Sequence, residues 1–170
     1  MELKGTGFTI RGWKLGDEVS LQKHANNPKV SANLMDRFPC PYTMDEAVKW
    51  VNSLLEQDPL INFAIDINGE VIGGIGVEPR IDVYRKTALI GYWLSEELWG
   101  RGIMPEAVKL VTNYAFKKLD FIRLQASVYS KNPASMRVLE KAGYVKEGVM
   151  RNAVIKNGVV LDEHMYAILK

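Results

Sequence analysis

The chain has 170 residues, of which 47% are hydrophobic and 25% charged, and this composition excludes wholesale disorder and predicts a single globular domain over residues 1–170. Its 22 basic and 20 acidic residues leave a net charge of +2, which is too balanced for a protein that binds nucleic acid by charge. One cysteine and two histidines exclude an internal disulfide and are too few for an ordinary zinc site, so we expect no metal.

The chain also lacks the sequence features that direct proteins to membranes. No stretch approaches the roughly 18 apolar residues that span a bilayer, and no basic run exceeds two residues. The first ten residues have no apolar core typical of a signal peptide. We therefore expect a cytoplasmic protein with no membrane partner and no direct nucleic-acid partner.

The N-terminal part is predicted to contain one strand and two helices. Residues 8–13 alternate as a short strand does, and a helix is expected over 17–26. Thr43 and Glu46 form a capping box, so a second helix begins there and runs to about residue 57. The helical spacing of its apolar residues predicts that it buries Ala47, Val48, Val51, Leu54 and Leu55.

The remaining chain is rich in strands. Two hairpins are predicted at Asn68-Gly69 and Asn157-Gly158, because these pairs tolerate the positive φ angles of tight turns. The elements expected in chain order are strands at 63–67, 71–77 and 87–94, a helix at 105–118, a strand at 122–128, a helix at 134–142, and strands at 144–155 and 159–168.

This order predicts the α/β class, with a mixed sheet of about seven strands flanked by about four helices. Parallel neighbouring strands need a crossover connection, which is usually a helix, so the helix at 105–118 is interpreted as a parallel step.

The segment that carries chemistry is a glycine-containing loop between the strand at 87–94 and the helix that follows. Gly100 and Gly102 allow a close approach of the backbone to an anion, and Arg101 between them adds a positive charge. The start of the helix adds free N–H groups at the positive end of its dipole. Pro105 stands where the dinucleotide-binding fingerprint requires its third glycine, so that fingerprint is excluded.

These residues resemble a known family. GYWL followed by WGRGIMPEA, at residues 91–107, resembles the acetyl-CoA loop of the GNAT N-acetyltransferases, and most closely the RimJ/RimL-type acetyltransferases of ribosomal-protein N-termini. The run from Asn132 to Ser135 and the EKAGY segment at 140–144 resemble the second family signature. The C-terminal hairpin resembles that of the same subgroup, so the resemblance covers essentially the whole chain.

The resemblance implies a GNAT fold and acetyl-CoA as co-substrate. Backbone amides of the loop would bind the CoA pyrophosphate, with Arg101, Gly102 and Met104 favoured. The strand end would pair with the pantetheine arm, and the Leu94 amide would bind the thioester oxyanion. The implied cofactor-binding set is Tyr92, Trp93, Leu94, Trp99, Gly100, Arg101, Gly102, Ile103, Met104 and Asn132. Trp99 and Met104 depart from the family consensus at its first and last positions.

The resemblance also assigns the proton transfers. Many family members use a helix tyrosine as the acid, but Leu139 occupies that position here. The subgroup instead implies Ser135 as the acid and Glu96 as the base, with Glu97 as the nearest rival. Glu96 would need a raised pKa, or a water relay, to act at neutral pH.

Structural interpretations stand beside these assignments. Asn132 followed by proline is also a good helix N-cap, Ser135 a simple helix-start residue, and the two glutamates a solvated pair. His24 is expected at the surface near a helix end, His164 in a strand, and Cys40 as a small residue packed in a loop.

The acceptor implied by the subgroup is a protein or peptide N-terminal amine, attacked directly in a ternary complex. A small amine acceptor (a polyamine, an amino acid or an aminoglycoside) is the second enzyme hypothesis. Two hypotheses of a different class also stay open: a CoA-binding module without catalysis, and a generic anion-binding Rossmann-like domain.

Overall fold

The computed structural model describes all 170 residues, which divide into two compact units. The first comprises Met1–Gly76 and Tyr92–Ile103, and the second comprises Val77–Gly91 and Met104–Lys170. Because the division cuts strands β4 (Glu70–Pro79) and β5 (Thr87–Leu94), each strand contributes a segment to both units.

The sheet of the first unit is antiparallel. Strands β1 (Glu2–Gly5), β2 (Phe8–Arg11), β3 (Asn62–Ile67) and β4 follow one another in space as in sequence. The β3–β4 turn places Asn68 at φ 53° and Gly69 at φ 90°, which confirms the predicted hairpin.

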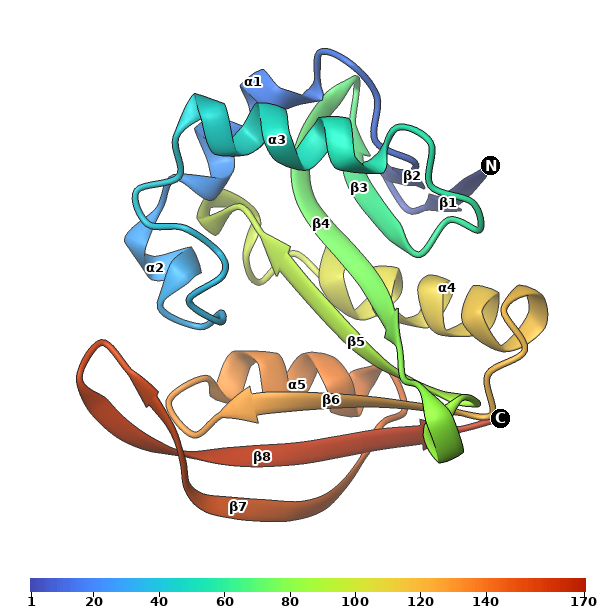
Figure 1. Cartoon of the computed structure of the whole chain (residues 1–170), viewed down its shortest axis with the longest axis vertical. Coiled ribbons are helices and arrows are strands. Elements are labelled where there is room, and N and C mark those ends of the chain that lie inside the picture. Colours follow the sequence, from blue (N-terminus) through green and yellow to red (C-terminus); the bar gives the residue numbers. More distant parts are fainter. The chain divides into compact units, whose positions relative to one another are not determined.

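Three helices belong to the first unit: α1 (Asp17–Ala25), α2 (Pro28–Ser31) and α3 (Met44–Leu54). Figure 1 shows α1 and α3 side by side in blue and cyan. The Thr43 hydroxyl accepts a hydrogen bond from the Glu46 amide, which confirms that part of the predicted cap. Helix, strand and loop residues form one core: Trp13, Leu21, Ala25, Tyr42, Ala47, Val51, Leu54, Ala64 and Val71.

Two residues predicted to be buried in α3 are not. Val48 and Leu55 are each 39% exposed, whereas Ala47, Val51 and Leu54 face the core. Val48 follows Ala47 and Leu55 follows Leu54. Successive residues of a helix are rotated by about 100° around its axis, so both side chains point away from the buried face.

The second unit contains the parallel step. β5 pairs in parallel with β6 (Arg123–Tyr129), and α4 (Ile103–Lys118) is the helix between them, as predicted. β8 (Val159–Leu169) pairs antiparallel with β6 and with β7 (Val145–Lys156), giving the order β5-β6-β8-β7.

Helix α5 (Pro133–Lys141) precedes β7, and hydrogen bonds hold both its first and its last turn. Asn132 caps its N-terminus and Pro133 is its first residue. The Tyr166 hydroxyl of β8 donates a hydrogen bond to Glu140 of α5, so this helix packs on the sheet (Figure 1).

The predicted element count was too low, since the chain forms eight strands and five α-helices, besides the short 3₁₀ turns η1 (Asp82–Tyr84) and η2 (Glu96–Leu98). The missed strand, β1, has four residues and pairs only with β2. The missed helix, α2, also has four residues, and its signal was present: Asn27 caps it and Pro28 begins it. No helix is long and apolar enough to cross a bilayer.

Candidate active site

The end of β5 is held by its own backbone and by the turn that follows. The Ser95 amide donates to the Ile72 carbonyl of β4 over 2.8 Å, and both Leu94 and Ser95 are buried. The turn η2 then closes when the Leu98 amide donates to Ser95 and the Trp99 amide donates to Glu96. The indole Nε1 of Trp99 lies 2.9 Å from the Leu94 carbonyl oxygen and donates to it. These hydrogen bonds therefore hold residues 94–99, the segment that follows β5, in one defined conformation.

The loop beyond this turn has the open backbone that an anion site needs. Gly100 and Gly102 adopt φ angles of 78° and 80°, which side chains rarely tolerate. A Cβ placed on either glycine would meet no atom within 4 Å, so the loop has free space beside its backbone. Arg101 is exposed between them. Steric room and positive charge thus occur together, as the sequence predicted.

Helix α4 begins at Ile103, two residues before the predicted start, and Pro105 is still within its first turn. Amides at a helix start have no partner within the helix, so Gly102, Ile103 and Met104 point their N–H groups out of its end. The Met104 side chain is buried, which keeps it out of the way of a phosphate. Because the Trp99 amide is already bonded to Glu96, the available donors begin after Trp99.

Of the strand-end aromatic residues, Trp93 turns its side chain toward the core of the first unit. Its ring lies 5.8 Å from that of Phe38, measured between centroids. A Cβ on Gly74 would lie 2.7 Å from the Trp93 indole nitrogen, and one on Gly73 would lie 2.6 Å from the Trp93 carbonyl oxygen. These two glycines therefore let β4 approach both the side chain and the backbone of Trp93 closely. Tyr92 is half-buried and alternates to the other face.

Glu96 is held by two residues from the α1–α2 corner. Lys29 Nζ lies 2.5 Å from Glu96 Oε1, and Asn27 Nδ2 lies 2.9 Å from Glu96 Oε2. The hydrogen bond from Lys29, and then that from Asn27, lower the pKa of the Glu96 carboxyl. A base at neutral pH needs a raised pKa, which Glu96 does not have. Glu96 could therefore act in proton removal only through a water relay. Glu97, its rival, is exposed.

Ser135 and Asn132 belong to the second unit. Asn132 Oδ1 accepts a hydrogen bond from the Ser135 amide over 3.1 Å, so the structural role of Asn132 is present. Ser135 is half-buried in the first turn of α5, and Leu139 is fully buried. The acid role of Ser135 stays a prediction.

Tyr144 does not replace the missing helix tyrosine. Its hydroxyl is 2.8 Å from that of Thr112, and the residue is buried. Burial raises the pKa of Tyr144 to about 12, so this phenol is a poor proton donor at neutral pH.

His24 lies near the end of α1, as expected, but not at the surface. Its side chain is only 9% exposed, and its two ring nitrogens link β4 to the residue that follows β5. Nδ1 lies 3.0 Å from Ser95 Oγ, and Nε2 lies 2.8 Å from Glu70 Oε1. The sequence carried no local signal for this bridge, because its partners lie 46 and 71 residues away. Cys40, expected to pack in its loop, is exposed.

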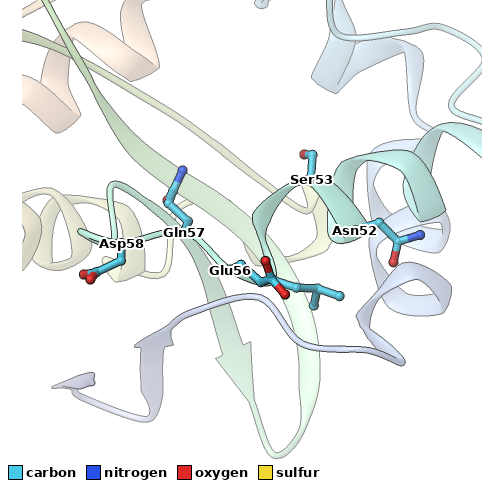
Figure 2. Close-up of a pocket in the computed structure, with 6 residues that line it drawn as sticks. Asn52, Ser53, Glu56, Gln57 and Asp58 are labelled. Atoms are coloured by element: carbon cyan, nitrogen blue, oxygen red, sulfur yellow. The ribbon is translucent and has the colours of Figure 1, made fainter.

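A separate depression of about 470 Å³ lies at the C-terminal end of α3, and Figure 2 shows the residues that line it. None of the predicted site residues lines this depression. Its lining residues are Asn52, Ser53, Leu55, Glu56, Gln57 and Asp58. Gln57 Oε1 accepts hydrogen bonds from the Ile61 and Asn62 amides, so this side chain shapes the turn into β3. No group of three or more His, Cys, Asp or Glu side chains is arranged to hold a metal ion.

Known proteins share both the sequence and the fold. Residues 8–145 match the family model described as an acetyltransferase (GNAT) domain. The probable N-acetyltransferase YjcK of Bacillus subtilis is 44% identical over 98% of this chain and 96% of its own length. The ribosomal-protein-serine acetyltransferase of Escherichia coli is 32% identical over 62% of this chain and 58% of its own.

A solved structure also matches over almost the whole chain. RimL, a ribosomal L7/L12 α-N-protein acetyltransferase solved with coenzyme A, superposes with a TM-score of 0.86 at 25% identity. The superposition covers 99% of this chain and 98% of RimL. The family match, the whole-length relative and this fold agree with the glycine loop at the start of α4. The chain belongs to the GNAT acetyltransferases and is an enzyme that uses acetyl-CoA as its co-substrate.

Proposed function

We propose that the enzyme acetylates the N-terminal amine of a protein or peptide, by direct attack of that amine on acetyl-CoA in a ternary complex. The observation that carries this proposal is the likeness to RimL at 25% identity over 99% of the chain. The 32% identity to a ribosomal-protein-serine acetyltransferase points to the same acceptor class.

For the co-substrate, we propose that the amides of Gly100 to Met104 bind the pyrophosphate, with Arg101 adding charge. Their positive-φ glycines and helix-start position support this role. The register between β5 and β6 ends at Leu89 and Gln125. The last residues of β5 therefore lie beyond that ladder, which supports pairing of Tyr92–Leu94 with the pantetheine arm.

For the chemistry, we propose that the Leu94 amide stabilises the oxyanion and that Ser135 protonates the departing thiolate. Glu96 would be the carboxylate that attracts the acceptor ammonium. Its lowered pKa keeps it charged but makes it a poor holder of the proton. The proton of the ammonium must therefore leave by a relay rather than stay on Glu96.

The charge around Glu96 favours an N-terminal amine over a polyamine. Lys29 pairs with this carboxylate at 2.5 Å and offsets part of its charge, so the end of β5 offers less negative charge than a polycation requires. A single ammonium needs less negative charge than a polycation does. This contrast adds to the likeness to RimL as a reason to rank the peptide acceptor first.

Thiol release from acetyl-CoA tests the proposal. The acceptors compared are a peptide with a free N-terminus, the same peptide with an acetylated N-terminus and an internal lysine, spermidine, and free amino acids. We expect release with the free N-terminus and none with the blocked peptide. Release with spermidine alone would establish the small-amine alternative. Coenzyme A binding without release from any acceptor would contradict acetyl transfer to the acceptors tested.

A further inference from the structure

Three side chains of the first unit form a continuous hydrogen-bonded path from the end of β5 to solvent. Ser95 Oγ is 3.0 Å from His24 Nδ1, and His24 Nε2 is 2.8 Å from Glu70 Oε1. Exposure rises along the path, because Ser95 is 3% exposed, the His24 side chain 9%, and the Glu70 side chain 44%. The inner end is therefore shielded from bulk water and the outer end is open to it.

The outer end fixes which nitrogen of the histidine carries a proton. Hydrogen bonds from Lys23 and then His24 lower the pKa of the Glu70 carboxyl, so Glu70 is ionised and can only accept. Nε2 of His24 must then be the N–H donor. In the neutral ring this leaves Nδ1 as an acceptor, and the Ser95 hydroxyl is the group that donates to it.

This arrangement gives Ser95 Oγ the character of a base. Its own proton points at Nδ1, so its lone pairs remain for another hydrogen-bond donor. Ser95 lies between Leu94 and Glu96, the residues proposed to contact the thioester and the ammonium. The hydrogen bond from the Ser95 backbone amide to the Ile72 carbonyl fixes the Ser95 backbone at that place.

We propose that Ser95, His24 and Glu70 form the proton relay that deprotonates the acceptor ammonium; this rests on the acetyl-transfer function proposed above. Ser95 Oγ takes a proton from the ammonium, directly or through one water, as its own proton passes to His24 Nδ1. One N–H bond and one O–H bond break while one O–H bond and one N–H bond form. The products are a neutral amine and an imidazolium.

The imidazolium is stabilised by the ionised Glu70 carboxylate and loses its Nε2 proton to water at the exposed outer end. After the products leave, Nε2 takes a proton back from water while Nδ1 returns its proton to Ser95 Oγ and the Ser95 hydroxyl proton passes to water, so the cycle releases one proton in total and restores the Nε2–H tautomer. No oxidant, metal or covalent intermediate is needed. The amine lone pair then attacks the thioester carbonyl.

The charged groups around His24 are mixed in sign. Lys23 of the same helix donates to the same Glu70 oxygen over 2.6 Å. Glu97 of η2 acts on Lys23 through its charge. Glu96 is already paired with Lys29. Glu70 is therefore the one carboxylate that bonds directly to the imidazole.

The first test separates proton removal from positioning. The acceptors are a glycyl peptide, protonated at pH 7, and its azaglycyl isostere, whose terminal nitrogen is already unprotonated. We expect His24→Gln and Ser95→Ala to lower kcat/KM for the glycyl peptide by about 100-fold and to change that for the azaglycyl peptide less than about threefold. The matched control is His164→Gln, which replaces the other histidine and should leave both values near wild type.

Equal losses with both peptides would mean that the histidine only positions the strand end, and would overturn the relay. Unchanged values with the glycyl peptide would overturn it as well. Circular dichroism of each variant confirms that it is folded before its kinetics are compared.

The second test needs no acceptor. In His164→Gln protein, His24 is the single histidine, so the ring ¹⁵N NMR shifts report its tautomer alone. We expect the neutral ring to carry its proton on Nε2. A proton on Nδ1 would overturn the relay and leave the proposed acetylation intact, whereas failure of every amine in the acceptor panel would overturn the proposed function irrespective of the tautomer.

Discussion

Lys29 Nζ lies 2.5 Å from Glu96 Oε1, and this pair joins helix α2 to the turn that follows β5. The ammonium lowers the pKa of the carboxyl, with a further contribution from Asn27. Glu96 is consequently negative over the whole neutral range. Electrostatic attraction of an ammonium and removal of its proton are different tasks, and this ion pair suits Glu96 to the first.

Replacing Lys29 by methionine should raise the pKa of Glu96 toward its ordinary value of 4.5. In the folded wild type the pKa is depressed, so the ion pair stabilises the protein above pH 4.5 and this contribution is lost as the pH falls through the folded-state value. Lys29→Met should therefore show a smaller loss of stability on acidification. Carboxyl ¹³C NMR titration measures the pKa directly.

The matched control for that titration is Lys49→Met, which removes a lysine paired with Glu46 at 3.4 Å. It should leave the titration of Glu96 where it is. A Glu96 titration that is the same in Lys29→Met and wild type would show that the pair has no effect on the carboxyl.

Gly102→Val should weaken coenzyme A binding by at least about tenfold, or roughly 1.4 kcal/mol. The glycine has φ 80°, which valine adopts only with strain, and the new side chain would occupy the space proposed for phosphate. Isothermal titration with coenzyme A gives the affinity. Gly7→Val is the matched control, because Gly7 has φ 79° and equally open surroundings.

Both glycine variants should lose thermal stability, since both carry the same backbone strain. Only Gly102→Val should lose affinity. If the two variants bound coenzyme A equally well, the pyrophosphate would have to lie elsewhere.

Much of the fold was predictable because its signals are local. The hairpin at Asn68-Gly69 needs only two residues that tolerate positive φ, and the cap at Thr43 needs only a hydroxyl three residues before a free amide. The glycines of the cofactor loop are equally local. The order of the elements followed from these local patterns, and the family resemblance then supplied the cofactor.

The missing parts depend on long-range packing. His24 looks like any polar residue near a helix end until β4 and β5 bring Glu70 and Ser95 to its two nitrogens. The lowered pKa of Glu96 likewise depends on Lys29, which is 67 residues away. No periodicity in the sequence encodes such pairs. The electrostatic surroundings of His24 and Glu96 could therefore not be predicted from the sequence.

Ser135→Ala should lower turnover about 100-fold if this hydroxyl is the acid, with little change in coenzyme A affinity or stability. The helix cap survives the change, because the cap uses the Ser135 backbone amide and the Asn132 side chain. Steady-state kinetics and calorimetry separate these quantities. Ser127→Ala, at an exposed position of β6, serves as the control.

Asn132→Ala, unlike Ser135→Ala, should lower the stability of the protein, because it removes the side chain that caps α5. Loss of an N-cap side chain costs about 1 kcal/mol, which urea denaturation can measure. Should Ser135→Ala keep full turnover with the true acceptor, another group must protonate the thiolate.

Arg11→Met should be the most destabilising of these changes, by about 3–5 kcal/mol. The Arg11 guanidinium bonds both oxygens of Asp17, at 2.7 and 2.8 Å, and lies 2.6 Å from Asp66. Burial alone would lower the pKa of Arg11, but its bonds to the two aspartates raise it. Without the arginine, the buried carboxylates of Asp17 and Asp66 would lose the cation that pairs with both of them.

Arg123→Met is the control for the stability change. It removes a bidentate pair with Glu147 whose side chains are 28% and 46% exposed. Because exposed pairs contribute little, this variant should lose no more than about 1 kcal/mol in urea denaturation. Equal losses in the two variants would show that burial of the Arg11 cluster adds nothing. A larger loss at Arg11 would mean that the start of α1, the helix that carries His24, depends on Arg11 for its attachment to β2 and β3.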